Sequence, residues 1–138
     1  DLVFLLDGSD SVTPQSFWTA KAFLRSVIGE FSLGPQHTQV SVFQYGGDVR
    51  QEFTLGTYQD HRALSVGLAV ITQLSGPRRT GAALQYAVRN GFSVANGGGR
   101  NVGKVLVLLS TGMSADSVQQ AANNAARAGI IVYALGVG

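Results

Sequence analysis

Hydrophobic and polar positions along the chain follow two different periods. Short runs of consecutive apolar residues end in glycine, serine or aspartate, which is typical of strands buried on both faces of a parallel sheet. Three such runs predict buried strands, at residues 2–6, 104–109 and 130–135. Residues 39–45 alternate instead, and residues 50–55 form a further short strand. Because the link between these last two is brief, we expect an antiparallel hairpin.

Helical spacing appears between the strands. From Thr13 and Pro14 to Phe31, apolar residues recur three and four positions apart, which predicts a helix with one apolar face. Threonine can cap the free N–H groups of a helix start and proline suits its first turn. Trp18 on this helix is expected to pack within the protein. The same spacing predicts further helices at residues 61–74, 81–92 and 114–128.

The order of these elements predicts an α/β fold. Alternating strands and helices with solidly apolar strands favour a doubly wound, mostly parallel sheet with one antiparallel edge strand and helices on both faces. The length of 138 residues fits a single domain spanning residues 1–138. The chain stops at a strand end, whereas a doubly wound sheet usually closes with a helix. We therefore expect that the carboxyl-terminal end is truncated.

Composition and charge exclude several classes of protein. Charged residues make up 13% of the chain, the net charge is +2, and no run of Lys and Arg exceeds two residues, so a nucleic-acid partner is not expected. Cysteine is absent, which excludes disulfide scaffolds, cysteine-based zinc sites and thiol catalysis. No stretch approaches the roughly 18 consecutive apolar residues of a membrane span, so membrane insertion is not expected either.

The first predicted strand is followed by a loop of small oxygen-bearing side chains. Ligands of doubly wound sheets bind beyond the carboxyl ends of the strands, which is where this loop belongs. Asp7, Ser9 and Ser11 offer one carboxylate and two hydroxyls at a spacing of two, and such oxygens suit Mg²⁺. In the alternative interpretation the serines cap the helix that begins near Pro14 and Asp7 closes an Asx turn. Spacing alone leaves both interpretations open.

The motifs resemble those of a known family. The segment Asp7-Gly8-Ser9-Asp10-Ser11, after its apolar run, resembles the first element of a von Willebrand factor type A domain. The segment Thr80-Gly81-x-Ala83-Leu84 resembles that family's Thr-Gly-x-Ala-Leu element, and residues 131–138 resemble its fifth strand. The resemblance covers essentially the whole chain, and the opening segment is most similar to the A domains of collagen VI alpha chains. Family members end with a further strand and helix, which again implies truncation.

The resemblance implies a metal-ion-dependent adhesion site that holds Mg²⁺. In the family, an Asp and two Ser of the first loop, a Thr of a middle loop and an Asp after the fourth strand bind the metal. The matching residues are Asp7, Ser9, Ser11, Thr80 and Thr111. Thr111 stands where the family has its second Asp, so one negative charge is missing, and the preceding arginines at 78 and 79 add positive charge if they point inward. We therefore expect a degenerate site, with weak or absent Mg²⁺ binding.

Three functions are considered for this chain. The resemblance implies a secreted, non-enzymatic cell-adhesion module of the extracellular matrix, whose partners are matrix proteins such as collagens and neighbouring A domains of the same chain. A purely structural spacer with a vestigial metal site is the alternative that Thr111 favours. The third is a hydrolase on a doubly wound sheet. Because neither His37 nor His61 lies in a candidate loop, and no glycine-rich phosphate loop follows a strand, no catalytic or cofactor-binding residue is assigned.

Overall fold

The computed structural model describes residues 1–110 and 117–136. Within these residues, five strands form one sheet in the order β3-β2-β1-β4-β5. Strand β3 runs antiparallel to β2, whereas the other neighbouring strands are parallel. The strands are β1 (Leu2–Asp7), β2 (Val40–Tyr45), β3 (Val49–Phe53), β4 (Val105–Ser110) and β5 (Ile131–Gly136).

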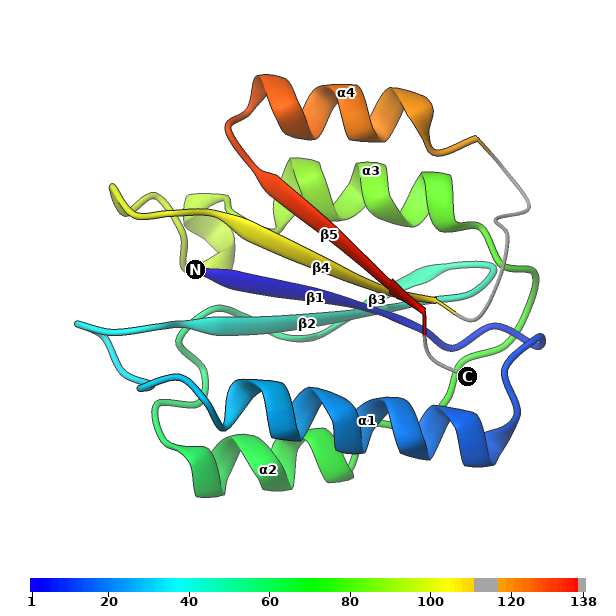
Figure 1. Ribbon diagram of the computed structural model, residues 1–138, viewed down its shortest axis with the longest axis horizontal. Helices are drawn as coiled ribbons and strands as arrows, with labels where there is room; N and C mark the ends of the chain where they lie inside the picture. Colours follow the sequence, from blue (N-terminus) through cyan, green and yellow to red (C-terminus); the bar gives the residue numbers. More distant parts are fainter. Residues whose placement is uncertain (111–116, 137–138) are drawn as a thin grey trace.

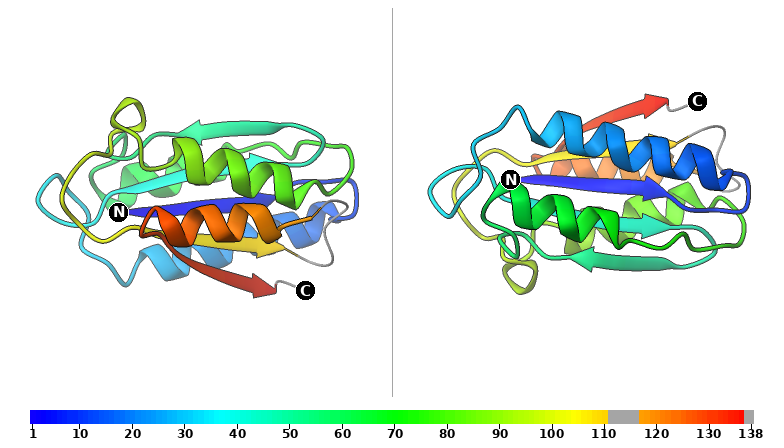
Figure 2. Two further views of the ribbon diagram at one scale, coloured as in Figure 1. Left: turned by 90° about the horizontal axis from the view of Figure 1, so that it is seen from above. Right: turned by 90° about the horizontal axis from the view of Figure 1, so that it is seen from below.

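Helices cover both faces of this sheet. Helices α1 and α2 lie on one face and α3 and α4 on the other (Figures 1 and 2). The predicted fold class, a doubly wound and mostly parallel sheet with one antiparallel edge strand, is confirmed. The helices are α1 (Pro14–Ile28), α2 (His61–Ala69), α3 (Thr80–Asn90) and α4 (Gln119–Arg127), with a short 3-10 turn at Val94–Asn96.

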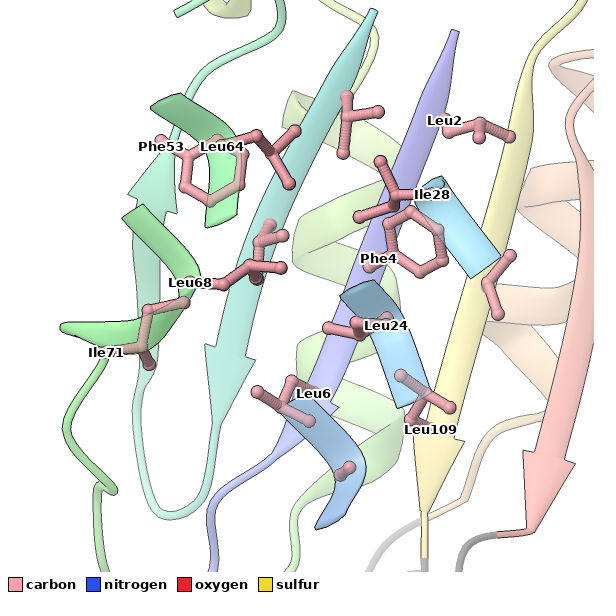
Figure 3. Close-up of a cluster of buried hydrophobic side chains, with 14 of the residues drawn as sticks. Leu2, Phe4, Leu6, Leu24, Ile28, Phe53, Leu64, Leu68, Ile71 and Leu109 are labelled. Atoms are coloured by element: carbon pink, nitrogen blue, oxygen red, sulfur yellow. The ribbon is translucent and has the colours of Figure 1, made fainter. Parts of the chain in front are cut away.

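Strand β1 is the centre of the hydrophobic core. Leu2, Phe4 and Leu6 point to the side of α1 and α2, where they pack with residues such as Leu24 and Ile28 (Figure 3). The intervening residues of β1 pack in a second cluster on the side of α3 and α4. Because both faces of the strand are covered, apolar residues occur consecutively rather than in alternation. The apolar run at residues 2–6 was therefore a sound predictor of a buried strand.

Strand β5 corrects one expectation. The apolar run at residues 130–135 predicted a strand buried on both faces, but Ile131, Tyr133 and Leu135 are exposed. Within the described residues β5 is an edge strand that pairs with β4 alone. Its Val132 packs against the core on the side of α3 and α4. On the other side of the sheet, β5 lies beyond the edge of α1 in the view from below (Figure 2). The prediction of burial on both faces was wrong because an apolar run does not reveal a strand's place in the sheet.

The helices are shorter than predicted, most clearly α1 and α2. Helix α1 ends at Ile28, so Phe31 lies beyond it and is exposed. Helix α2 ends at Ala69, and residues 71–79 form an irregular segment instead of the predicted end of a helix. The expectation that Trp18 packs inside was also wrong, since its side chain is 67% exposed on α1. Helix α4 begins at Gln119, so residues 117 and 118 are not helical as predicted, and the predicted start at residues 114–116 lies outside the described residues.

The capping prediction for α1 holds. Thr13 is its N-cap, and the Thr13 hydroxyl accepts a hydrogen bond from the backbone N–H of Ser16 at 3.1 Å. Pro14 occupies the first turn, where its missing N–H costs nothing. Because the cap fixes where α1 begins, it also fixes the length of the loop between β1 and α1.

We expect Leu24→Ala to destabilise the protein by about 2–5 kcal/mol, because it leaves a cavity in the core between α1 and β1. Leu24 is fully buried. Urea unfolding followed by circular dichroism measures the change. Val66→Ala on α2 is the control: that valine is 62% exposed, so the free energy of unfolding should change by less than about 0.5 kcal/mol. Equal losses in the two variants would contradict this assignment of the core.

Candidate functional site

Strands β1, β2 and β4 run parallel, so their carboxyl ends lie at one end of the sheet (Figure 1). The chain passes from β1 to β2 on one side and later crosses to β4 on the other, so the strand order reverses at β1. Such a reversal opens a binding position at the carboxyl ends of the strands in doubly wound sheets. Asp7, the last residue of β1, occupies this position. We call the surroundings of Asp7, together with the start of α3, the rim.

Asp7 carries a buried carboxylate with several partners. Its side chain is 3% exposed. Oxygen Oδ1 accepts a hydrogen bond from the backbone N–H of Ser9 at 3.0 Å, which closes an Asx turn. Oxygen Oδ2 accepts from Arg78 Nε at 2.6 Å, and the Ser110 hydroxyl lies 3.4 Å from the same oxygen. The guanidinium therefore balances the charge of this carboxylate directly.

Thr80 joins the start of α3 to strand β2. It is the first residue of α3, is 3% exposed, and its hydroxyl lies 3.0 Å from the hydroxyl of Tyr45. Tyr45 is the last residue of β2 and stands opposite Asp7 in the parallel register. Burial raises the pKa of the Tyr45 hydroxyl above its ordinary value. Tyr45 was not among the residues predicted for the site, although its position at a strand end was a signal for the rim.

Gln44 fixes the irregular segment that leads to the rim. Its side chain is fully buried. Its Oε1 accepts from the backbone N–H of Leu74 at 2.6 Å, and its Nε2 donates to the carbonyl of Thr72 at 2.9 Å and to Glu52 at 2.8 Å. A Cβ atom at Gly8 would lie 1.8 Å from Gln44 Oε1, so a larger residue there would displace this hydrogen-bonded amide. Sequence reasoning missed this residue, because an amide inside an alternating strand carries no sign of what it binds.

The remaining predicted site residues differ in their surroundings. Ser9 is fully buried, and its hydroxyl has no hydrogen-bond partner in the described part of the chain. Ser11 is exposed and makes no side-chain hydrogen bond among residues 1–110 and 117–136. Thr111 lies outside the described residues. The structure thus links Asp7 to Ser9, and links Thr80 to Tyr45, the neighbour of Asp7 in the sheet, whereas Ser11 takes part in none of these hydrogen bonds.

The side-chain oxygens at the rim match a divalent cation only in part. The oxygens of Asp7, Ser9 and Thr80 are of the type that Mg²⁺ prefers, and the unpartnered Ser9 hydroxyl agrees with a ligand. The charges do not agree, because Arg78 already pairs with Asp7 and would repel a dication beside the same carboxylate. No group of three or more His, Cys, Asp or Glu side chains that could hold a metal occurs among the described residues. With Arg78 in this place, the described residues do not fit a divalent cation.

Comparison with known proteins agrees with this architecture. Residues 1–138 match the sequence model of the von Willebrand factor type A domain. The chain belongs to this family. It is 36% identical to Matrilin-1 of Gallus gallus, over 100% of this chain and 28% of that protein. It is 39% identical to Matrilin-3 of Mus musculus, over 99% of this chain and 29% of that protein. The von Willebrand factor A domain described here therefore spans less than a third of the length of these relatives.

Solved structures share the fold. Proximal thread matrix protein 1 from the mussel byssus superposes with a TM-score of 0.91 at 25% identity, over 99% of this chain and 36% of that one. Manganese-loaded TRAP protein of Plasmodium vivax gives a TM-score of 0.86 at 19% identity, over 100% of this chain and 57% of that one. A further structure of the mussel protein has zinc in its adhesion-site motif. It superposes with a TM-score of 0.92 at 24% identity, over 99% of this chain and 37% of that one.

No helix in the described part of this A domain is long and apolar enough to cross a membrane.

We expect Tyr45→Phe to lower the free energy of unfolding by about 1–2 kcal/mol, because it removes the hydroxyl that binds buried Thr80. Chemical unfolding at neutral pH measures the loss. Tyr133→Phe is the matched control, since Tyr133 is 55% exposed on β5 and should tolerate the change. If the two variants are equally stable, the Tyr45–Thr80 contact contributes nothing.

The same pair of variants predicts a difference at alkaline pH. Because the pKa of Tyr45 is raised in the folded protein, the neutral hydroxyl contributes stability that is fully present below about pH 10 and is lost as the pH rises through the folded pKa. Wild-type protein and Tyr133→Phe should therefore lose more stability than Tyr45→Phe between about pH 9 and pH 12. Parallel curves for all three proteins would contradict the assignment.

Proposed function

We propose that this von Willebrand factor A domain, residues 1–138, is a secreted, non-enzymatic adhesion module of the extracellular matrix that binds protein partners at the rim. The observation that carries the proposal is the polar cluster of Asp7, Ser9 and Thr80 at the reversal of strand order. The similarity to matrilins and to a mussel thread matrix protein supports a place in the matrix. The partners proposed are matrix proteins such as collagens, and neighbouring A domains of the same chain.

The proposal includes a degenerate metal site of the adhesion type, with weak or absent Mg²⁺ binding. The likeness of the opening segment to collagen VI A domains and the replacement of an Asp by Thr111 remain predictions from the sequence. The Arg78–Asp7 ion pair supports weak binding, because these two charges sum to zero before any cation arrives.

Catalysis is the less supported alternative. Nucleophilic catalysis needs a base beside the nucleophile. His37 and His61 are both exposed, and neither is a side-chain hydrogen-bond partner of Asp7, Ser9 or Thr80 among the described residues. A structural spacer is the other alternative. It differs from an adhesion module in one testable respect, since a spacer does not require an accessible rim.

Substitution of Thr111 tests the metal part of the proposal. Thr111→Asp restores a carboxylate to the fifth position of the family's site and gives the cluster one net negative charge. We expect the affinity for Mn²⁺ and Mg²⁺ in calorimetric titration to rise by roughly tenfold or more, about 1.4 kcal/mol per factor of ten. Thr57→Asp, an exposed threonine at the other end of the sheet, is the control and should leave the titration unchanged. If Thr111→Asp is equally silent, the site is vestigial.

Charge reversal at the rim tests the adhesion part. Arg79 is exposed beside the start of α3, whereas Arg62 is exposed near the start of α2, at the opposite end of the sheet. We expect Arg79→Glu to weaken binding to immobilised collagen by roughly tenfold in surface plasmon resonance, and Arg62→Glu to leave it unchanged. Binding that responds to neither change, or no binding at all, would favour the spacer.

A further inference from the structure

We infer that the guanidinium of Arg78 is the resident cation of the rim, and that it holds the Asp7 carboxylate in the place a divalent ion would take. The inference deepens the proposed function and rests on it for the role of the rim. It concerns how the rim is assembled, whichever partner the domain binds. It follows from the disagreement between the donor oxygens, which suit a metal, and the charges, which do not.

The ion pair itself is short and sheltered. Arg78 Nε lies 2.6 Å from Asp7 Oδ2, and the two side chains are only 12% and 3% exposed. Charge-assisted hydrogen bonds of this length are the strong ones, particularly away from water. A carboxylate buried at the end of β1 needs a positive partner, and this one is supplied by the chain.

Several hydrogen bonds hold the irregular segment before Arg78, residues 71–77, in place. Gln73 donates its side-chain N–H to the carbonyls of Val12 at 2.8 Å and Ser9 at 3.3 Å, which ties the segment to the loop after β1. The backbone N–H of Asp10 donates to the carbonyl of Gly76 at 2.9 Å. Together with the bonds from Gln44, these contacts fix the residues before Arg78 on both sides. The arginine is therefore presented by a fixed segment.

The turn between β2 and β3 also contacts this segment. The backbone N–H of Gly47 donates to the carbonyl of Ser75 at 3.0 Å. A Cβ atom at Gly46 would lie 2.2 Å from that same carbonyl oxygen, so the close approach requires glycine at position 46. Glycine at 46 thus lets this turn approach the segment that carries Arg78, whereas glycine at 8 leaves room for the Gln44 side chain that binds the same segment.

A dication at Asp7 would therefore have to displace a partner that the fold has positioned. Oxygen Oδ1 is engaged by the backbone of Ser9, and Oδ2 by Arg78. The charges of Asp7 and Arg78 cancel, so little attraction for a cation is left. Replacing Arg78 by a neutral residue leaves the negative charge of Asp7 uncompensated by this arginine, next to Ser9, whose hydroxyl has no hydrogen-bond partner among residues 1–110 and 117–136. That variant should gain the metal response that the wild type lacks.

The experiment compares Arg78→Gln with Arg79→Gln, which removes an equal charge one residue away. Thermal unfolding is measured in EDTA and in millimolar Mn²⁺, and paramagnetic broadening of the amides of residues 8–10 is followed by NMR. Wild-type protein and Arg79→Gln should have the same Tm in both buffers and sharp loop amides. Arg78→Gln should melt several degrees lower in EDTA, recover in Mn²⁺ and show broadened loop amides. Adding Asp7→Asn should abolish that recovery.

Two results would overturn the inference. One is a wild-type protein whose Tm and loop amides respond to Mn²⁺ as those of Arg78→Gln do. The other is an Arg78→Gln protein that ignores the metal. If Arg78→Gln does not fold in EDTA, Arg78→Lys keeps the positive charge and should fold and remain insensitive to Mn²⁺, and a metal response in this variant would also overturn the inference. Loss of collagen binding with an intact Arg78→Gln response would instead count against the proposed function alone.

Discussion

A carboxylate buried at the end of the central strand must have its charge balanced, and the rim is organised around this constraint. Asp7 ends β1, with strands on both sides and helices above and below. The described structure meets the constraint with Arg78 at 2.6 Å and with the backbone N–H of Ser9. An unpaired carboxylate at this depth would cost several kcal/mol, so the loop after β1 and the segment before α3 are energetically linked.

This energetic link between the loop after β1 and the segment before α3 explains several features that are far apart in the sequence. Buried Gln44, the glycines at 8 and 46, and Gln73 all serve to hold residues 71–79 against the loop after β1. The same segment ends α2 early, because its backbone binds side chains instead of continuing a helix. A rim whose cation is covalently part of the chain keeps its shape when the concentration of divalent ions changes. This property suits an adhesion module that recognises partners by shape and charge.

The sequence predicted the architecture well and the details of the rim only in part. Consecutive apolar residues and helical spacing were sufficient for the fold class, because burial on one or both faces leaves a direct periodicity. They failed for β5, since position at a sheet edge is decided by topology. The grouping of Asp7 with Thr80 came from the family resemblance. Positive charge near the site was expected from Arg78 and Arg79 if they point inward. That Arg78 pairs directly with Asp7 could not be predicted, because this pairing depends on an irregular segment fixed by contacts between residues distant in sequence. The role of Thr111 remains a prediction.

A double-mutant cycle on Asp7 and Arg78 tests the central claim most directly. The free energies of unfolding of wild type, Asp7→Asn, Arg78→Gln and the double variant are measured by urea unfolding in EDTA. Since both side chains are buried and in contact, the account predicts a coupling energy of about 1–3 kcal/mol, with the double variant more stable than the sum of the single losses implies. Strictly additive losses would show that the pair does not assemble the rim and would contradict the account.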